Sequence, residues 1–169
     1  TLASAATAVT VDADLRGEIE SVAASGGAGG TGAATGSFTT NELTASVQAQ
    51  ALSVTQSANG GAFAVTADND ADILSVAGTV SGGGTAAAGV AVSVNEIGGD
   101  VTAKVADSTL RATGAVTVDA TSSGLVKSVA AGVAGGGTAA LAGSNTTNAI
   151  TSTVLAQMSG VTQSATSSS

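Results

Sequence analysis

The residues best suited to chemistry lie in the segment Asp68-Asn69-Asp70-Ala71-Asp72, where carboxylates recur at alternate positions. Carboxylates at this spacing supply the hard oxygen ligands that Ca²⁺ takes in loop sites. The loop pattern then fails, because Ile73 stands where the loop needs glycine and no glutamate closes it. A weak Ca²⁺ site at Asp68, Asp70 and Asp72 therefore competes with a solvated acidic turn, and the sequence favours the turn.

Asparagine recurs at equivalent places in the chain, at Asn41, Asn95 and Asn148. Such a row could contact a ligand from the surface. It could also form an internal ladder of amides that satisfies buried polar groups. The structural ladder is the favoured interpretation.

Other kinds of chemistry lack their usual residues, since the chain has no Cys and no His. Catalytic triads and soft-metal sites are built mainly from these two residue types. The run Gly82-Gly83-Gly84-Thr85 is not a phosphate loop, because no lysine follows it. We expect a turn there, in which successive glycines permit positive φ and close approach of backbones. The acidic residues also lack the aromatic neighbours that would stack a sugar. The sequence predicts no enzyme, no catalytic residue and no cofactor.

The charge is acidic, with a formal net charge of −8 and only four basic residues. These four are scattered, whereas nucleic-acid binding needs clustered Lys and Arg. Three uncharged spans, 21–41, 75–95 and 128 onward, approach the length of a transmembrane helix. Their runs of Gly, Thr and Ser make poor helices, so strands and turns are predicted and no membrane span.

The whole chain consists of an internal repeat with a period of 53–54 residues. Ser-Val-Ala, the glycine run with its Thr, and the asparagine all recur at this period, which is the signature of a repeat architecture. We predict one elongated domain, 1–169, with repeats at about 1–61, 62–114 and 115–169. Both ends fall within a repeat, so we expect a fragment of a longer array.

Within each repeat the apolar residues alternate with a period of two, which predicts four β-strands per repeat. The first strand places Phe63 and Val65 inward. The fourth places Val101 inward and, in the last copy, Val154, Ala156 and Met158. The third strand keeps one face constant in kind, with Ser or Ala, then Thr or Ser, then Asn, then Leu or Ile, while its other face varies. The varying face carries Val90, Val92 and Val94, which we therefore expect outside as a possible contact strip.

A repeat this poor in large apolar residues must stack on its neighbours to bury a core. The predicted fold is all-β, a right-handed parallel β-solenoid (β-helix) with two or three rungs of about 18 to 25 residues per repeat. The alternative is an antiparallel β-sandwich or meander in each repeat, because glycine turns also suit hairpins.

The repeats resemble those of large bacterial surface adhesins, the autotransporter and filamentous-haemagglutinin-like β-helical proteins. The resemblance is carried by Gly-Gly-Gly-Thr-Ala-Ala at 82–87 and 135–140 and by Ser-Thr-Leu-x-Ala-x-Gly-x-Val-Thr-Val at 108–118. It implies a secreted or surface-exposed structural protein, a stalk module for adhesion or for cell–cell and biofilm contact. The partners it implies are neighbouring repeats and glycans or proteins of host or bacterial surfaces.

A self-assembling subunit of an extracellular filament or sheath is the alternative function. In it, open terminal strands would pair with the next chain.

Overall fold

The structure, a computed structural model, describes residues 8–56 and 59–164. The start of the first predicted repeat (1–7), residues 57–58 and the end of the third (165–169) lie outside the described residues. The described chain is almost entirely β-strand. The strands are β1 (Ala8–Gly29), β2 (Gly32–Leu52), β3 (Ala62–Gly83), β4 (Ala86–Ala106), β5 (Thr109–Leu110), β6 (Val116–Gly136), β7 (Ala139–Ser159) and β8 (Thr162–Gln163).

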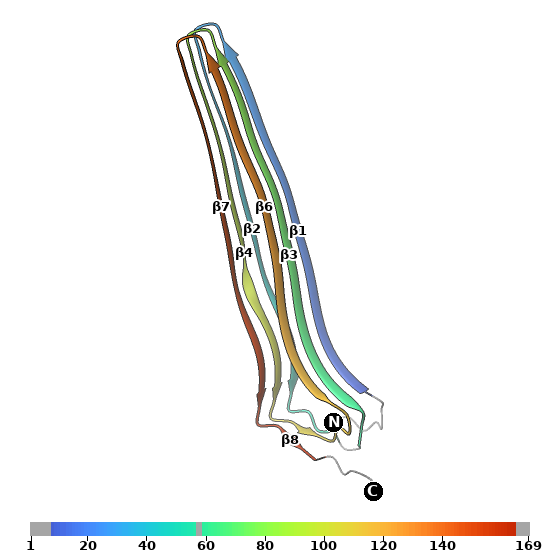
Figure 1. The fold of residues 1–169 in the computed structure, drawn as a ribbon. Helices are drawn as coiled ribbons and strands as arrows, with labels where there is room; N and C mark the ends of the chain where they lie inside the picture. Colours follow the sequence, from blue (N-terminus) through green and yellow to red (C-terminus); the bar gives the residue numbers. More distant parts are fainter. Residues whose placement is uncertain (1–7, 57–58, 165–169) are drawn as a thin grey trace.

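The six long strands form two parallel three-stranded sheets, in the orders β1-β3-β6 and β2-β4-β7, and β5 pairs with β8. Each repeat sends one strand up the first sheet and one strand down the second (Figure 1). Every strand pairing in the described part of the chain is parallel and joins different repeats. The all-β prediction is confirmed, and the antiparallel alternative is wrong for these pairings.

The prediction of four short strands per repeat is wrong, because each predicted pair of strands is one continuous strand of 21 or 22 residues. The polar segment 68–72 does not interrupt β3, since its residues alternate between the two faces and hydrogen-bond to β1 and β6. No proline is available to remove a ladder donor. A repeat therefore contributes one strand to each sheet, not the two or three rungs that we expected.

The register is kept without a break along each sheet. Val9 pairs with Phe63, and Phe63 pairs with Val116. The offset is 54 residues in the first pairing and 53 in the second. Since the strands match residue for residue, the difference falls in the connections between one repeat and the next. The strands thus keep equivalent side chains in rows across the stack.

The apolar core fills the half of the molecule opposite the glycine turns. Phe63, Val65, Val101 and Leu110 are fully or almost fully buried there, together with alanines such as Ala103. These side chains belong to the second repeat, and the same core includes Val47, Ala49 and Ala51 of the first repeat and the partly buried Val116 of the third, so it is built where the repeats stack. The inward placements predicted for Phe63, Val65 and Val101 are confirmed.

The glycine turns connect the two sheets at the other end (Figure 1). A Cβ atom on Gly83 would lie 1.9 Å from the carbonyl oxygen of Ala86, and Gly29 and Gly136 meet the same obstacle in their own repeats. We expected these glycines to permit positive φ as well as close approach. Positive φ among the described glycines occurs instead at Gly99 and Gly160, so close approach is what the turns require.

The two sheets are staggered, so each inner strand faces two strands of the other sheet. β4 packs against both β3 and β6, whereas β7 packs only against β6. The inner row of β7 is consequently exposed: Val154 and Met158 are each 47% exposed, whereas Val101 and Val105 of β4 are buried. The predicted burial of Val154, Ala156 and Met158 is therefore wrong in this chain, because no further strand covers them.

Candidate functional site

The acidic residues of β3 lie on the outer face of the first sheet. Asp70 and Asp72 are exposed and Asp68 is half-buried, while Asn69 between them points inward and is 3% exposed. Strand geometry imposes this alternation, because successive side chains leave opposite faces. The five-residue segment therefore cannot wrap around one ion as a loop does.

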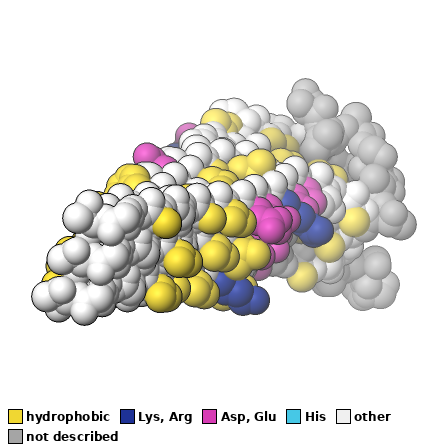
Figure 2. All heavy atoms as spheres, turned by 90° about the horizontal axis from the view of Figure 1, so that it is seen from above, with side chains coloured by type: hydrophobic (Ala, Val, Ile, Leu, Met, Phe, Trp, Pro, Cys, Tyr) yellow, Lys and Arg dark blue, Asp and Glu magenta, His cyan; other side chains and the backbone are white. Residues whose placement is uncertain are grey.

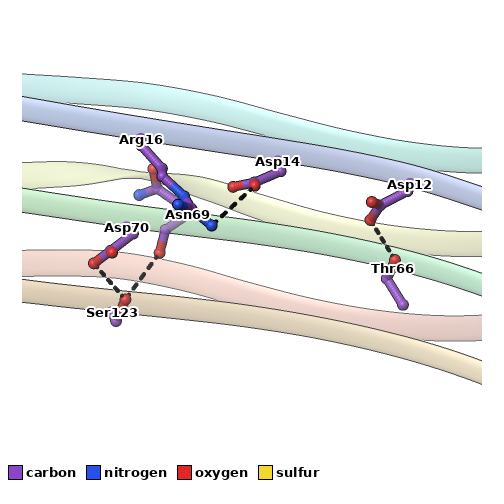
Figure 3. A network of polar contacts seen from close by, with 7 residues as sticks. All are labelled: Asp12, Asp14, Arg16, Thr66, Asn69, Asp70 and Ser123. Atoms are coloured by element: carbon purple, nitrogen blue, oxygen red, sulfur yellow. Dashed lines mark hydrogen bonds and ion pairs between the residues drawn. The ribbon is translucent and has the colours of Figure 1, made fainter.

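Polar contacts occur along the outer face of β1, β3 and β6, both within a strand and between strands (Figure 3). Arg16 of β1 lies 3.5 Å from the Asp14 carboxylate, measured from Nη2 to Oδ2. Ser123 of β6 donates a hydrogen bond of 2.8 Å to Asp70. Thr66 donates to Asp12 on the same face. These contacts are exposed, so each contributes about 1 kcal/mol or less.

The register sets acidic residues beside one another across β1 and β3, with Asp14 opposite Asp68 and Glu18 opposite Asp72. A depression of about 310 Å³ lies beside the second pair, lined by Arg16, Gly17, Glu18, Asp70 and Asp72. Within residues 8–56 and 59–164, no three carboxylates converge on a point that could hold a metal ion. Side chains two apart on one strand are separated by about 6.6 Å, too far to share the 2.3–2.6 Å ligand shell of Ca²⁺.

The three asparagines are register partners on the adjacent strands β2, β4 and β7, on the inner face of the second sheet. Asn41 donates from Nδ2 to Oδ1 of Asn95 at 2.7 Å, and Asn95 donates to Oδ1 of Asn148 at 2.8 Å. Asn95 is 1% exposed. The amides form a hydrogen-bonded ladder with one direction, in which Asn41 and Asn95 are buried between the sheets and Asn148 of the edge strand β7 is exposed.

Hydroxyl groups continue this polar layer between the sheets. Ser75 is within 2.8 Å of Ser93 and within 3.0 Å of Thr39, measured between side-chain oxygens. Ser21 accepts from Asn41 at 2.8 Å, and Ser128 donates to Ser93 at 3.0 Å. All three repeats therefore contribute to one buried polar network across both sheets.

Beyond this network, toward the turns, the usual distribution of residue types is inverted. The inner face carries small side chains such as Ala77, Thr79 and Ser81, all at most 3% exposed. The outer face carries apolar side chains such as Val22 and Val80, which are 69% and 62% exposed. No charged residue occurs in 21–41, 75–95 or 128–148, the parts of the chain that build this half.

The inner faces lie close together here. A Cβ atom on Gly89 of β4 would be 2.9 Å from the carbonyl oxygen of Val133 of β6, in the opposite sheet. Larger inner residues would force the sheets apart. The small residues therefore set the sheet spacing, and the large apolar residues of this half stand on the outside.

The outer face of the first sheet orders these residues into rows that run across the repeats. Two valine rows alternate with two rows of Ala and Gly; we call this surface the ridged face. From the charged half toward the turns, the rows are Val22-Val76-Val129, Ala24-Gly78-Ala131, Gly26-Val80-Val133 and Ala28-Gly82-Gly135. Viewed from the turn end, apolar side chains gather beside the turns and the charged ones lie further back (Figure 2).

The predicted contact strip Val90, Val92 and Val94 lies on the outer face of the second sheet. Val90 is 44% exposed, and the other two are half-buried. The outward placement of these valines is confirmed by their alternation with the buried Ala91, Ser93 and Asn95. The strip is only one strand wide, however. Its register partners in the other copies are Gly36, Phe38, Thr40, Gly143, Asn145 and Thr147.

Sequence reasoning missed the ridged face, although a signal for it was present. Ser-Val-Ala occurs in all three repeats at 21–23, 75–77 and 128–130. Since its Ser and Ala belong to the inner face, its Val must point outward in every copy. Identical outward valines in three copies were thus a stronger pattern than the valines of one copy at 90–94.

No helix long and apolar enough to cross a membrane occurs among the described residues. Comparison of the chain with known protein families, curated proteins and solved structures finds no match. The resemblance to surface adhesin repeats accordingly stays a prediction.

Proposed function

We propose that the chain is a structural repeat module of an extracellular bacterial surface protein, with no catalytic activity. The observation that carries this proposal is the in-register stacking of three copies around a core that they share. The acidic side chains support a structural role, since they stand in open rows on an outer face.

The core shows why the unit is a module of an array. Phe63 and Val65 of the second repeat pack with Val47 of the first and with the partly buried Val116 of the third. A single repeat would leave these side chains in water and lose roughly 1.5–3 kcal/mol for each large one. Stability therefore grows with the number of stacked repeats, as in other repeat proteins.

The proposed architecture of the full array is a parallel β-solenoid of two long strands per turn, right-handed as predicted from the sequence. Each repeat would lengthen the stack by only about 4.8 Å, the spacing between strands, while each strand is about 70 Å long. A stack of a few repeats is therefore much wider, along its strands, than it is long. Such an array is better suited to presenting broad outer faces than to forming a thin stalk.

Adhesion, cell–cell contact and biofilm contact remain the proposed biological setting, and they rest on the resemblance of the repeats. The proposed partners are other repeats and surface glycans or proteins. Labelling of intact cells of the source organism with an antibody against the chain tests the location. Strong labelling without permeabilisation is expected, whereas labelling only after lysis would contradict it.

The modular part of the proposal is tested with chains of two, three, four and five repeats, made by deleting or duplicating residues 62–114. The melting temperature and the free energy of unfolding should rise with repeat number. A two-repeat chain as stable as the five-repeat chain would contradict shared stabilisation.

Assembly into a filament is a second candidate function, favoured by the direction of the asparagine ladder. Asn41 and Asn148 stand at its two ends, so the acceptor end of one chain would suit the donor end of another. Head-to-tail contacts of this kind do not close and give fibres. Electron microscopy of the concentrated chain tests it, and fibres lost on changing Asn148→Leu would support it.

A further inference from the structure

We propose that the ridged face is a self-association surface, on which a second copy of this chain binds face to face with its strands running in the opposite direction. The proposal goes beyond the structural role, because it names the partner of one particular surface. It rests on the glycines, the row pattern and the distribution of charge.

Three of the four glycines of the ridged face stand beside open space. A Cβ atom on Gly78, Gly82 or Gly135 would meet no atom within 4 Å, and none of these residues has positive φ. Glycine weakens a strand, and inside a strand it often marks a place where another backbone approaches closely. The approaching group must come from outside the described chain, since nothing in it occupies this space.

The rows of the ridged face are complementary to themselves when one copy is reversed. In order from the charged half, the face presents valine, small, valine and small rows. Reversal places the row of Val76 opposite the row of Gly82, and the row of Gly78 opposite the row of Val80. Each valine row then packs against a row of small Ala and Gly residues of the partner. Each contact occurs twice about a two-fold axis, as in isologous dimers.

The charge distribution selects the reversed orientation over the parallel one. All twelve acidic residues lie outside 21–41, 75–95 and 128–148, so the half that carries the ridged face is neutral. In a reversed pair the two acidic halves point away from each other. In a parallel pair they would face each other across the interface, and like charges would repel.

The same surface fits a lipid bilayer poorly. In the described part of the chain, the outer edges of β1 and β6 are unpaired and flank the ridged face. Open strand edges are not tolerated in hydrocarbon, because their N–H and C=O groups would lose water without gaining a partner. A second copy leaves these edges in water.

The size of the face predicts weak association for this chain. Seven positions along each of three strands cover about 23 Å by about 14 Å, or roughly 320 Å². A stable interface buries about 800 Å² on each partner. The dimer of the three-repeat chain should thus be transient, and duplicating repeats should strengthen it in proportion.

The test uses sedimentation velocity of the full chain over a wide concentration range. The expected result is a reversible monomer–dimer equilibrium that is weakened about tenfold or more by Gly78→Thr. The substitution enlarges a row of small residues on the ridged face, and its Cβ atom meets no atom of the chain within 4 Å. Gly143→Thr is the matched control, because it also meets open space but lies on the other sheet, and it should leave the equilibrium unchanged.

The orientation is measured by double electron–electron resonance with a spin label at Asp72→Cys, which is exposed and outside the rows. The reversed dimer places the two labels about 46 Å apart, whereas a parallel dimer brings them to about 10 Å. A chain that stays monomeric would overturn the proposal, as would association insensitive to Gly78→Thr. Binding to neutral phosphatidylcholine vesicles that Gly78→Thr abolishes, without self-association, would also overturn it by showing that lipid is the occupant.

Discussion

Asn95 receives a hydrogen bond from Asn41 at 2.7 Å although the two residues are 54 positions apart in the sequence. The contact exists because the register of β2 and β4 places the same residue of successive repeats side by side. Asn95 in turn donates a hydrogen bond to Asn148. The Asn95 amide therefore links three repeats, and its removal should destabilise the packing of all three.

The first prediction concerns this ladder. Asn95→Ala leaves the amide groups of Asn41 and Asn148 without one partner each, and the Asn41 amide is buried. We expect a loss of about 1–3 kcal/mol in the free energy of unfolding, measured by urea denaturation. The control Asn145→Ala removes an exposed amide of β7 and should cost less than about 0.5 kcal/mol. Equal effects of the two changes would refute a structural ladder.

The second prediction concerns the shared core. Val101 is 1% exposed and packs with residues of neighbouring strands, so Val101→Asp buries a carboxylate without a partner. It should cost about 3–5 kcal/mol or prevent folding. The control Thr102→Asp introduces the same charge on the outer face, one residue away, and should be nearly neutral. Similar thermal unfolding of the two variants would show that the faces are assigned wrongly.

The third prediction concerns the turns. Gly83→Ala places a Cβ atom against the Ala86 carbonyl, so the turn must shift at a cost of about 1–3 kcal/mol. Gly82→Ala, one residue earlier, meets open space and should not destabilise. Differential scanning calorimetry compares them. The account fails here if Gly82→Ala lowers the melting temperature as much as Gly83→Ala does.

The fourth prediction concerns like charges on the second sheet, where Glu42 lies opposite Glu96. Glu96→Lys converts a repulsive pair into an attractive one and should stabilise by about 0.2–1 kcal/mol. Glu96→Gln removes the repulsion alone and should gain less. Both gains should shrink in high salt, because these side chains are exposed. A stabilisation that is independent of salt would have to come from another source.

Period-two patterns and repeat offsets were enough to predict strands, stacking and the inner face, as Phe63 and Val101 show. The strand length was not predictable from the same patterns. Asp68 to Asp72 has the composition of a turn, and only hydrogen bonding to β1 and β6 on either side keeps it extended. Local propensity was overridden by pairing between repeats.

The candidate sites were likewise predictable from the sequence only in part. The asparagines could be matched by their spacing alone, and the structure joins them directly. Asp68, Asp70 and Asp72 were also placed on one face, but a strand keeps them apart where a loop would have gathered them. The ridged face required two facts together, the alternation of faces and the alignment of repeats, since each row takes one residue from each strand.

Disulfide mapping tests the central claim, the parallel in-register stacking of the repeats, most directly. The chain has no native cysteine, so introduced pairs report without interference. Gln48 and Thr102 are register partners on the outer face of β2 and β4. Adjacent strands hold such partners about 4.8 Å apart, within the range that a disulfide spans. We expect rapid oxidation of the pair Gln48→Cys with Thr102→Cys, and little oxidation of Gln48→Cys with Lys104→Cys. Preferential oxidation of the second pair, or of neither, would contradict the parallel register.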